Sequence, residues 1–172
     1  PISTAFWEPE PVTVTLGSVA VAYPAYGFLQ ATLDGEAALI AAVKQILGEA
    51  ALVADLFSGL GTFALSVGEG RKIYAAEADR EAITGLKSAA GRAQRAIFTE
   101  HRDLFRRPLT AEELNRFDAI ILDVGLPDGD GRDLCLRLRK QGHHMPIIML
   151  TGSEGEVDVV HGLDSGANDY IA

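Results

Sequence analysis

The sequence predicts an α/β fold in which helices cover both faces of a parallel sheet. Short apolar runs have the length and composition of buried strands, at residues 51–57, 72–78, 96–101, 118–124, 146–152 and 169–172. Segments with helical spacing of apolar residues lie between them, near residues 61–68, 80–94, 110–116, 130–141 and 156–166. Strands that alternate with helices indicate parallel neighbours joined by crossover helices. We therefore expect a doubly wound, three-layer sandwich.

The region before the first of these strands predicts an N-terminal arm. Residues 12–22, VTVTLGSVAVA, are rich in β-branched residues on either side of a glycine, which indicates a β-hairpin. Asp34 then begins DGEAALIAAVKQILGEA, in which apolar residues recur at helical spacing and Asp34 is a suitable N-cap. We expect an arm at residues 1–33, half of the sheet at 34–123, and a second half at 124–172 that completes the same sheet.

Composition and charge limit the classes of partner. The 172 residues are 48% hydrophobic and 23% charged, which is typical of a globular domain with a core. The net charge of −9 disfavours nucleic acid and anionic membranes as partners. A single cysteine excludes an internal disulfide, and no apolar run reaches the roughly 18 residues of a membrane span. We expect a cytoplasmic protein, with Arg102, Arg106 and Arg107 on a solvated loop.

A glycine-rich loop follows the first strand of the predicted sheet. The segment DLFSGLGTFALSV contains Gly59 and Gly61 between a strand and a helix, with Ala64 three residues further on. Glycines at this position allow a tight turn and bring backbone N–H groups close to a ligand at a helix N-terminus. Glu77 ends the next strand, where a carboxylate can accept hydrogen bonds from the ribose of an adenosine cofactor. An ordinary turn with a surface glutamate is the alternative.

Charge distinguishes two adenosine cofactors for this loop. Asp55 lies just ahead of the glycines, where its carboxylate would repel the pyrophosphate of a nicotinamide dinucleotide. The same carboxylate would attract the ammonium group of S-adenosylmethionine. We therefore expect S-adenosylmethionine, a small-molecule partner, at this loop.

Residues of about 12–123 resemble class I S-adenosylmethionine-dependent methyltransferases, and more closely those that methylate uridine C5 in RNA. The resemblance lies in AYGFLQAT before the first helix, in DLFSGLGTFAL, in YAAEADREAI and in EHRDLF. It implies a Rossmann-like fold. It also implies roles for Gln30 near the target base, for Asp55, Gly59 and Gly61 at the methionine end, for Glu77 at the ribose and for Asp103 at the adenine. Phe57 and Asp123, at strand ends, are further candidate cofactor contacts.

The sequence departs from this family after Asp123. The family continues with D-P-P-R and later supplies a cysteine nucleophile, whereas here Val124 and Gly125 follow Asp123. Methylation at uridine C5 requires a thiolate that attacks C6. The only cysteine, Cys135, lies in a predicted helix among leucines, where we expect it to be a core residue. We therefore expect a methyltransferase-derived chain that is catalytically inactive and has no catalytic residue.

From about residue 118 to 172 the sequence resembles the C-terminal half of a response-regulator receiver domain. The segments LDVGLPDGDGRDLCLRLRK, MPIIMLTG and GLDSGANDYIA carry this resemblance. It implies that Asp123 is a phospho-acceptor, that Thr151 is a switch hydroxyl and that the Gly125 carbonyl helps to hold Mg²⁺. A receiver also needs an acidic pair and a lysine. At the corresponding strand end this chain offers Asp55, so a metal site would rest on Asp55 and Asp123.

Together the two resemblances lead to the hypothesis of an engineered chimera. The joined sheet would be entirely parallel with strand order 3-2-1-4-5-6, and the N-terminal hairpin would attach at one side. The abrupt ends of the sequence favour an excised, recombined piece. We expect S-adenosylmethionine binding without the full activity of either family. A phospho-acceptor at Asp123 in two-component signalling and a fold without any ligand are the alternatives. The last strand, DYIA, would be an edge open to self-association.

Overall fold

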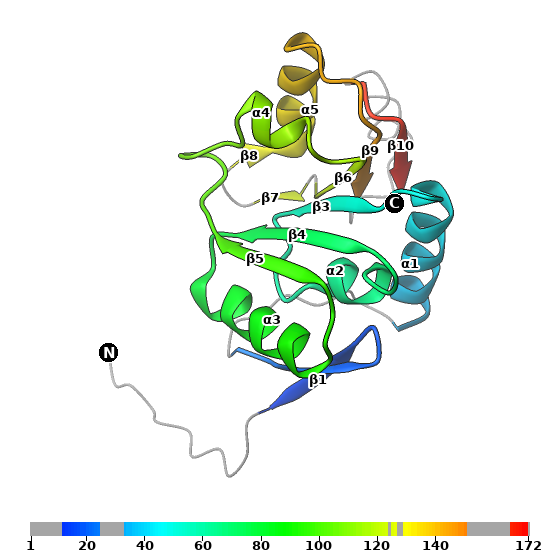
Figure 1. Ribbon diagram of the computed structural model, residues 1–172, viewed down its shortest axis with the longest axis vertical. Helices are drawn as coiled ribbons and strands as arrows, with labels where there is room; N and C mark the ends of the chain where they lie inside the picture. Colours follow the sequence, from blue (N-terminus) through cyan, green and yellow to red (C-terminus); the bar gives the residue numbers. More distant parts are fainter. Residues whose placement is uncertain (1–11, 25–32, 124, 127–128, 151–165, 172) are drawn as a thin grey trace.

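A computed structural model describes residues 12–24, 33–123, 125–126, 129–150 and 166–171 (Figure 1). The helices are α1 (Leu33–Leu47), α2 (Thr62–Val67), α3 (Arg80–Arg92), α4 (Ala111–Leu114) and α5 (Gly131–Lys140). The main sheet contains β3 (Leu52–Leu56), β4 (Lys72–Glu77), β5 (Ile97–His101), β6 (Ala119–Asp123), β9 (Ile147–Leu150) and β10 (Asp169–Ile171). Two small hairpins are formed by β1 (Thr13–Leu16) with β2 (Val19–Ala22) and by β7 (Gly125–Leu126) with β8 (Gly129–Asp130).

The six strands of the main sheet have the order β10-β9-β6-β3-β4-β5. Every neighbouring pair is parallel. Counted along the chain, this arrangement is the predicted order 3-2-1-4-5-6, so the fold class and the topology are confirmed. The predicted helix at 156–166 lies almost wholly outside the described residues.

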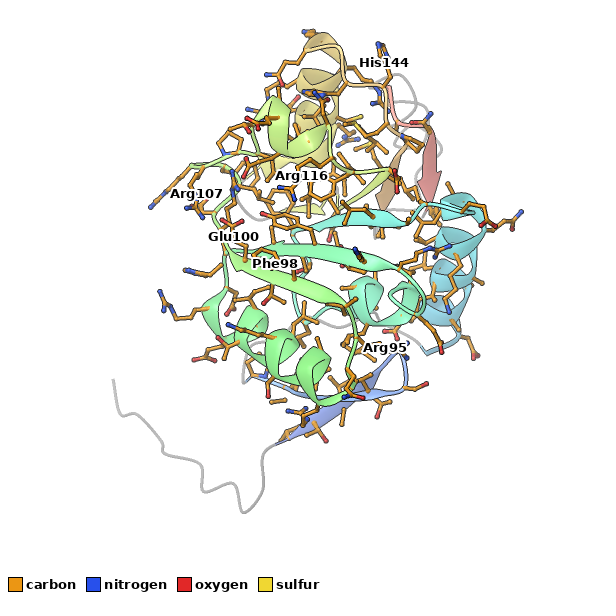
Figure 2. All side chains as sticks on the ribbon, in the orientation of Figure 1. Arg95, Phe98, Glu100, Arg107, Arg116 and His144 are labelled. Atoms are coloured by element: carbon orange, nitrogen blue, oxygen red, sulfur yellow. The ribbon has the colours of Figure 1, made fainter. Side chains whose placement is uncertain are left out.

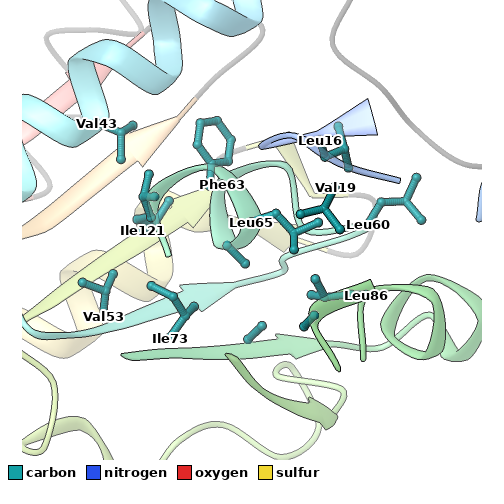
Figure 3. Close-up of a cluster of buried hydrophobic side chains, with 14 of the residues drawn as sticks. Leu16, Val19, Val43, Val53, Leu60, Phe63, Leu65, Ile73, Leu86 and Ile121 are labelled. Atoms are coloured by element: carbon teal, nitrogen blue, oxygen red, sulfur yellow. The ribbon is translucent and has the colours of Figure 1, made fainter. Parts of the chain in front are cut away.

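Helices cover both faces of the sheet because the strands alternate in the direction of their side chains. Val53, Ile73 and Ile121 face a core cluster shared with α1, α2, α3 and the N-terminal hairpin. Figure 3 shows part of this cluster, in which Phe63 and Leu65 of α2 approach the sheet. Ala54 and Ile120 face the second cluster, which includes residues of α4 and α5. Two apolar layers with the sheet between them give the expected three-layer sandwich.

The N-terminal hairpin packs on the helical layer rather than extending the sheet. Its turn approaches α2 so closely that a Cβ on Gly17 would lie 2.6 Å from the backbone carbonyl of Leu65. Gly17 also has a φ of 52°, which favours glycine. Arg92 of α3 donates a hydrogen bond of 2.7 Å to the Ala20 carbonyl in β2. The hairpin thereby packs against α2 and α3 and covers the core on that side. Among the described residues, no helix is long and apolar enough to cross a membrane.

Candidate functional site

Three carboxylates lie at the carboxyl edge of neighbouring parallel strands. Asp55 belongs to the last part of β3, while Glu77 and Asp123 end β4 and β6. The strand order places β3 directly between the other two strands. Ligands of doubly wound sheets bind beyond this edge. The structure therefore brings the predicted acids and the glycine-rich loop into one region.

Positive φ angles shape the loop that leads from β3 to α2. Phe57, Gly59 and Gly61 have φ angles of 60°, 53° and 89°. At Gly61 a Cβ would lie 2.4 Å from a methyl carbon of buried Leu86, so the loop packs tightly on α3. A Cβ at Gly59 would meet no atom of the described residues within 4 Å. Gly61 thus lets the loop pack against the core, and Gly59 leaves open space beside its backbone.

Asp55 is buried beneath this loop. One oxygen of its carboxylate accepts a hydrogen bond of 2.9 Å from the backbone N–H of Ala64 in α2. Burial raises the pKa of Asp55 from 3.8 to about 7, although the hydrogen bond from Ala64 opposes the shift. The negative charges of Glu77 and Asp123 raise the pKa further. Asp55 is therefore poised to gain or lose a proton near neutral pH, and a nearby cation would favour its charged form.

Glu77 connects the glycine-rich loop to the start of α3. One carboxylate oxygen accepts a hydrogen bond of 2.8 Å from the Gly59 N–H, and the other accepts one of 2.8 Å from the Asp79 N–H. Asp79 in turn caps α3 by accepting hydrogen bonds from Glu81 and Ala82. The side chain of Glu77 is therefore held in one place against the loop. Each of its oxygens has a further lone pair for a ligand hydroxyl.

Asp103 holds the loop that follows β5. Its carboxylate accepts hydrogen bonds of 3.0 Å from the backbone N–H groups of Phe105 and Arg106. The Arg106 side chain also lies 3.3 Å from it. The rings of Phe105 and Phe57 are 5.3 Å apart, so this loop contacts the end of β3. The contact brings the segments of Asp103 and Phe57 together at the same edge of the sheet.

Other predicted positions are less completely placed. Gln30 and Thr151 lie outside the described residues. Asp123 is half-buried at the end of β6, in register with Leu150 of β9. In the part of the chain that the structure describes, no three or more His, Cys, Asp or Glu side chains are grouped to hold a metal ion. Cys135 is fully buried, as expected for a core residue.

Arg102 differs from its expected place on a solvated loop, because its side chain is only 6% exposed. The guanidinium donates hydrogen bonds of 2.7 and 3.0 Å to the two carboxylate oxygens of Glu113, and others to the carbonyls of Arg107 and Pro108. This pairing lowers the pKa of Glu113 to about 2. Arg102 therefore fixes the 102–113 segment. The capping box of Thr110 and Glu113 was the available sequence signal for this segment.

A protein-family comparison identifies the C-terminal part. The model of the response regulator receiver domain matches residues 76–172, more than half of the chain. The chain belongs to the receiver domain family. This match begins at the end of β4, well upstream of Asp123. It therefore includes much of the region that also resembles methyltransferases.

Much of the chain is similar to RNA methyltransferases. An uncharacterized RNA methyltransferase of Zymomonas mobilis is 61% identical over 117 residues, which are 68% of this chain and 30% of that protein. One of Rhizobium meliloti is 38% identical over 137 residues, or 78% of this chain and 32% of that protein. The chain thus spans about a third of the length of these relatives. The findings together support a protein of two parts, one methyltransferase-like and one receiver-like.

A solved structure agrees with the fold. The tRNA (uracil-54, C5)-methyltransferase of Pyrococcus abyssi, in complex with S-adenosyl-L-homocysteine, superposes with a TM-score of 0.63 at 21% identity. The similarity covers 81% of this chain and 34% of that one. At this identity the similarity shows a shared fold.

The sheet differs from that of a receiver by one strand. Receivers have the flavodoxin-like order 2-1-3-4-5. Strands β4-β3-β6-β9-β10 of this chain have that same order, and β5 is an additional strand at the edge. Strand β3 lies upstream of the matched residues and pairs with both β4 and β6. The place of the first receiver strand, beside β6, is therefore taken by β3 of the methyltransferase-like part.

Proposed function

We propose that the chain binds S-adenosylmethionine at the glycine-rich loop and does not transfer its methyl group. The observation that carries this proposal is the position of Glu77, which accepts the Gly59 N–H at 2.8 Å. This contact joins the acid that would bind a ribose to the loop that would border the rest of the cofactor. An ordinary surface glutamate would have no such connection to the loop.

The surroundings of the loop suit this cofactor. The open space beside Gly59 leaves room for a ligand against the backbone. The Ser58 hydroxyl in the same loop is buried and has no hydrogen-bond partner among the described residues. Asp55 would hold its charged form more strongly beside the ligand's ammonium group. When bound, S-adenosylmethionine would supply an electrophilic methyl group, but the residues named here would only bind and orient it.

Methyl transfer to uridine C5 is not part of the proposal because the chain lacks a nucleophile. Cys135 lies on α5 and is fully buried in the cluster that includes Ala54 and Ile120. A thiol in such surroundings is a core side chain rather than an exposed thiolate. We further propose that the two parts were joined by recombination within β6, since that strand belongs to both resemblances.

Phosphorylation of Asp123 is the second candidate, and the receiver-family match favours it. The acids at this edge argue against efficient phosphorylation. Strand β3 lies between β4 and β6, so Glu77 is one strand removed from Asp123. The acid between them is Asp55, which is buried and has a raised pKa. Because Mg²⁺ prefers several charged or polar oxygens in near-octahedral geometry, these three residues do not fit it well.

Titration calorimetry tests the proposed binding. S-adenosylhomocysteine, which cannot donate a methyl group, should bind the wild-type protein with measurable heat. The Glu77→Ala variant should bind it at least about tenfold more weakly, because hydrogen bonds to a charged group contribute roughly 1.5–3 kcal/mol. Glu81→Ala is the matched control, since Glu81 is an exposed acid in the first turn of α3. The absence of heat at millimolar ligand would refute the proposal.

A further inference from the structure

A groove lies near the amino ends of β4 and β5, away from the glycine-rich loop. Its volume is about 580 Å³, and it is lined by residues of these two strands and by residues in and on either side of α4. Figure 2 shows Phe98 and Glu100 along β5, Arg116 over the adjacent part of the sheet and Arg95 at the start of the strand. The volume lies in the range of small-molecule sites. The glycine-rich loop is absent from its lining.

Three aromatic rings form the floor of the groove. Phe98 and Tyr74 are register partners on β5 and β4, and their rings are stacked with centroids 5.9 Å apart and planes 16° apart. The ring of Phe117 also contacts that of Tyr74, with centroids 5.3 Å apart and planes tilted by 35°. Phe98 is 66% exposed, which is unusual for a large apolar side chain. Its ring therefore offers a flat apolar surface to a planar ligand.

The rim of the groove is positively charged although the whole chain carries −9. Lys72, Arg95 and Arg116 contribute the cations. Among the described residues, no carboxylate forms an ion pair with Lys72 or Arg116, and Arg95 lies 3.8 Å from the highly exposed Glu69. The two acids of the lining are neutralised by arginines, Glu113 by Arg102 at 2.7 Å and Glu100 by Arg107 at 2.7 Å.

We propose that this groove binds a nucleobase that carries a phosphate, with the base on Phe98 and the phosphate near Arg116 and Lys72. Aromatic side chains stack on any base, and arginine matches the geometry of phosphate oxygens. A purely apolar partner would instead desolvate the cations of the rim without compensation. The ligand has two sources with the same chemistry, a free nucleotide and a single strand of RNA. The local charge permits either one despite the unfavourable net charge.

Fluorescence anisotropy with fluorescein-labelled hexauridylate, and competition by free UMP, test this site in the full chain. Phe98→Ala and Arg116→Ala should each weaken binding on the order of tenfold, through lost stacking and a lost phosphate contact. Leu136→Ala and Lys87→Ala are matched controls, an exposed apolar residue on α5 and an exposed cation on α3. Both controls should bind like the wild type. Thermal melting should confirm that all four variants are folded.

The competition distinguishes the two sources. Displacement by UMP at a concentration similar to that of unlabelled hexauridylate identifies a free nucleotide, and displacement by hexauridylate alone identifies single-stranded RNA; both support the site. Absence of saturation with either probe at millimolar concentration overturns it, as does equal binding by all four variants. Glu77→Ala should leave the groove unaffected, so this site and the glycine-rich loop can fail independently.

Discussion

Glu77 and Asp123 end strands that lie on either side of β3, so the carboxyl edge carries Asp55 between them. In the receiver order 2-1-3-4-5, β3 has the place of the first strand, beside β6. The acid beside Asp123 is therefore Asp55, which is buried and has a raised pKa. The glycine-rich loop that follows β3 lies directly beside Glu77. The same strand thus carries the buried acid next to Asp123 and leads into the candidate cofactor loop.

Phosphorylation should fail because the acid beside Asp123 is the buried Asp55. After incubation with acetyl phosphate and Mg²⁺, the intact mass of the protein should be unchanged, because the described residues group no three potential ligands that could hold the metal ion for an acyl phosphate at Asp123. An Asp123→Asn variant is the control for modification elsewhere. A mass increase of one phosphoryl group in the wild type, and its loss in the variant, would contradict the prediction.

Replacement of Asp55 by asparagine should stabilise the protein at alkaline pH. The folded-state pKa of about 7 lies above the ordinary value of 3.8, so the folded protein binds more protons than the unfolded chain between these values. Wild-type stability should therefore fall as pH rises from about 4 to about 7. Asp55→Asn removes this loss and keeps an oxygen for the Ala64 N–H. At pH 8 the free energy of unfolding of Asp55→Asn should exceed that of the wild type by up to about 4 kcal/mol, because each pKa unit corresponds to roughly 1.4 kcal/mol.

Urea unfolding at pH 4.5 and pH 8 measures this effect. The difference between wild type and Asp55→Asn should be small at the lower pH and large at the higher one. Asp133→Asn, an exposed substitution on α5, should change the free energy of unfolding by the same amount at both pH values. A destabilised Asp55→Asn at pH 8 would show that the charged carboxylate is favourable in the folded protein.

The two glycines of the loop should respond differently to alanine. Gly61→Ala combines a φ of 89° with a contact of 2.4 Å to Leu86 in the core, and should cost about 2–4 kcal/mol. At Gly59 the φ is 53° but no described residue comes within 4 Å of the added Cβ, so Gly59→Ala should cost about 1 kcal/mol. Urea unfolding of the two variants gives the comparison. Equal losses would mean that backbone strain, and not packing on α3, determines both costs.

Arg102 and Arg106 should differ in their contribution to stability. Arg102→Met removes a buried guanidinium that binds Glu113 and two carbonyls, and should cost about 2–4 kcal/mol. Arg106→Met should cost less than about 0.5 kcal/mol, because that side chain is 90% exposed. Calorimetric melting measures both. Adding Glu113→Gln to Arg102→Met should recover part of the lost stability. If Glu113→Gln instead lowers stability as much in the variant as in the wild type, the two residues act independently.

The strands and their order could be predicted because they depend on local patterns. Apolar runs such as 118–124 mark buried parallel strands, and the alternation with helices limits the topology. Contacts between distant segments could not be predicted in this way. The buried place of Arg102 depends on carbonyls that only the folded loop presents to it. His143 is likewise buried by a contact with Asn115, 28 residues away in the sequence.

In the candidate site, too, local patterns could be predicted and contacts between distant segments could not. The spacing of Gly59, Gly61 and Glu77 indicated a cofactor loop, because glycine and a strand-end acid have local signatures. The raised pKa of Asp55 arises from burial and from two acids on other strands, which no single segment reveals. The aromatic groove could not be predicted from the sequence either, because Tyr74, Phe98 and Phe117 come from three separate segments.

Amide NMR spectra recorded during addition of S-adenosylhomocysteine test the proposed cofactor site most directly. The proposal predicts that the largest shifts occur at Gly59, Gly61 and Asp79, whose N–H groups border or contact Glu77 and the loop. The amides of Phe98 and Arg116 should shift little. Unchanged spectra at millimolar ligand, or shifts concentrated in the aromatic groove, would contradict it.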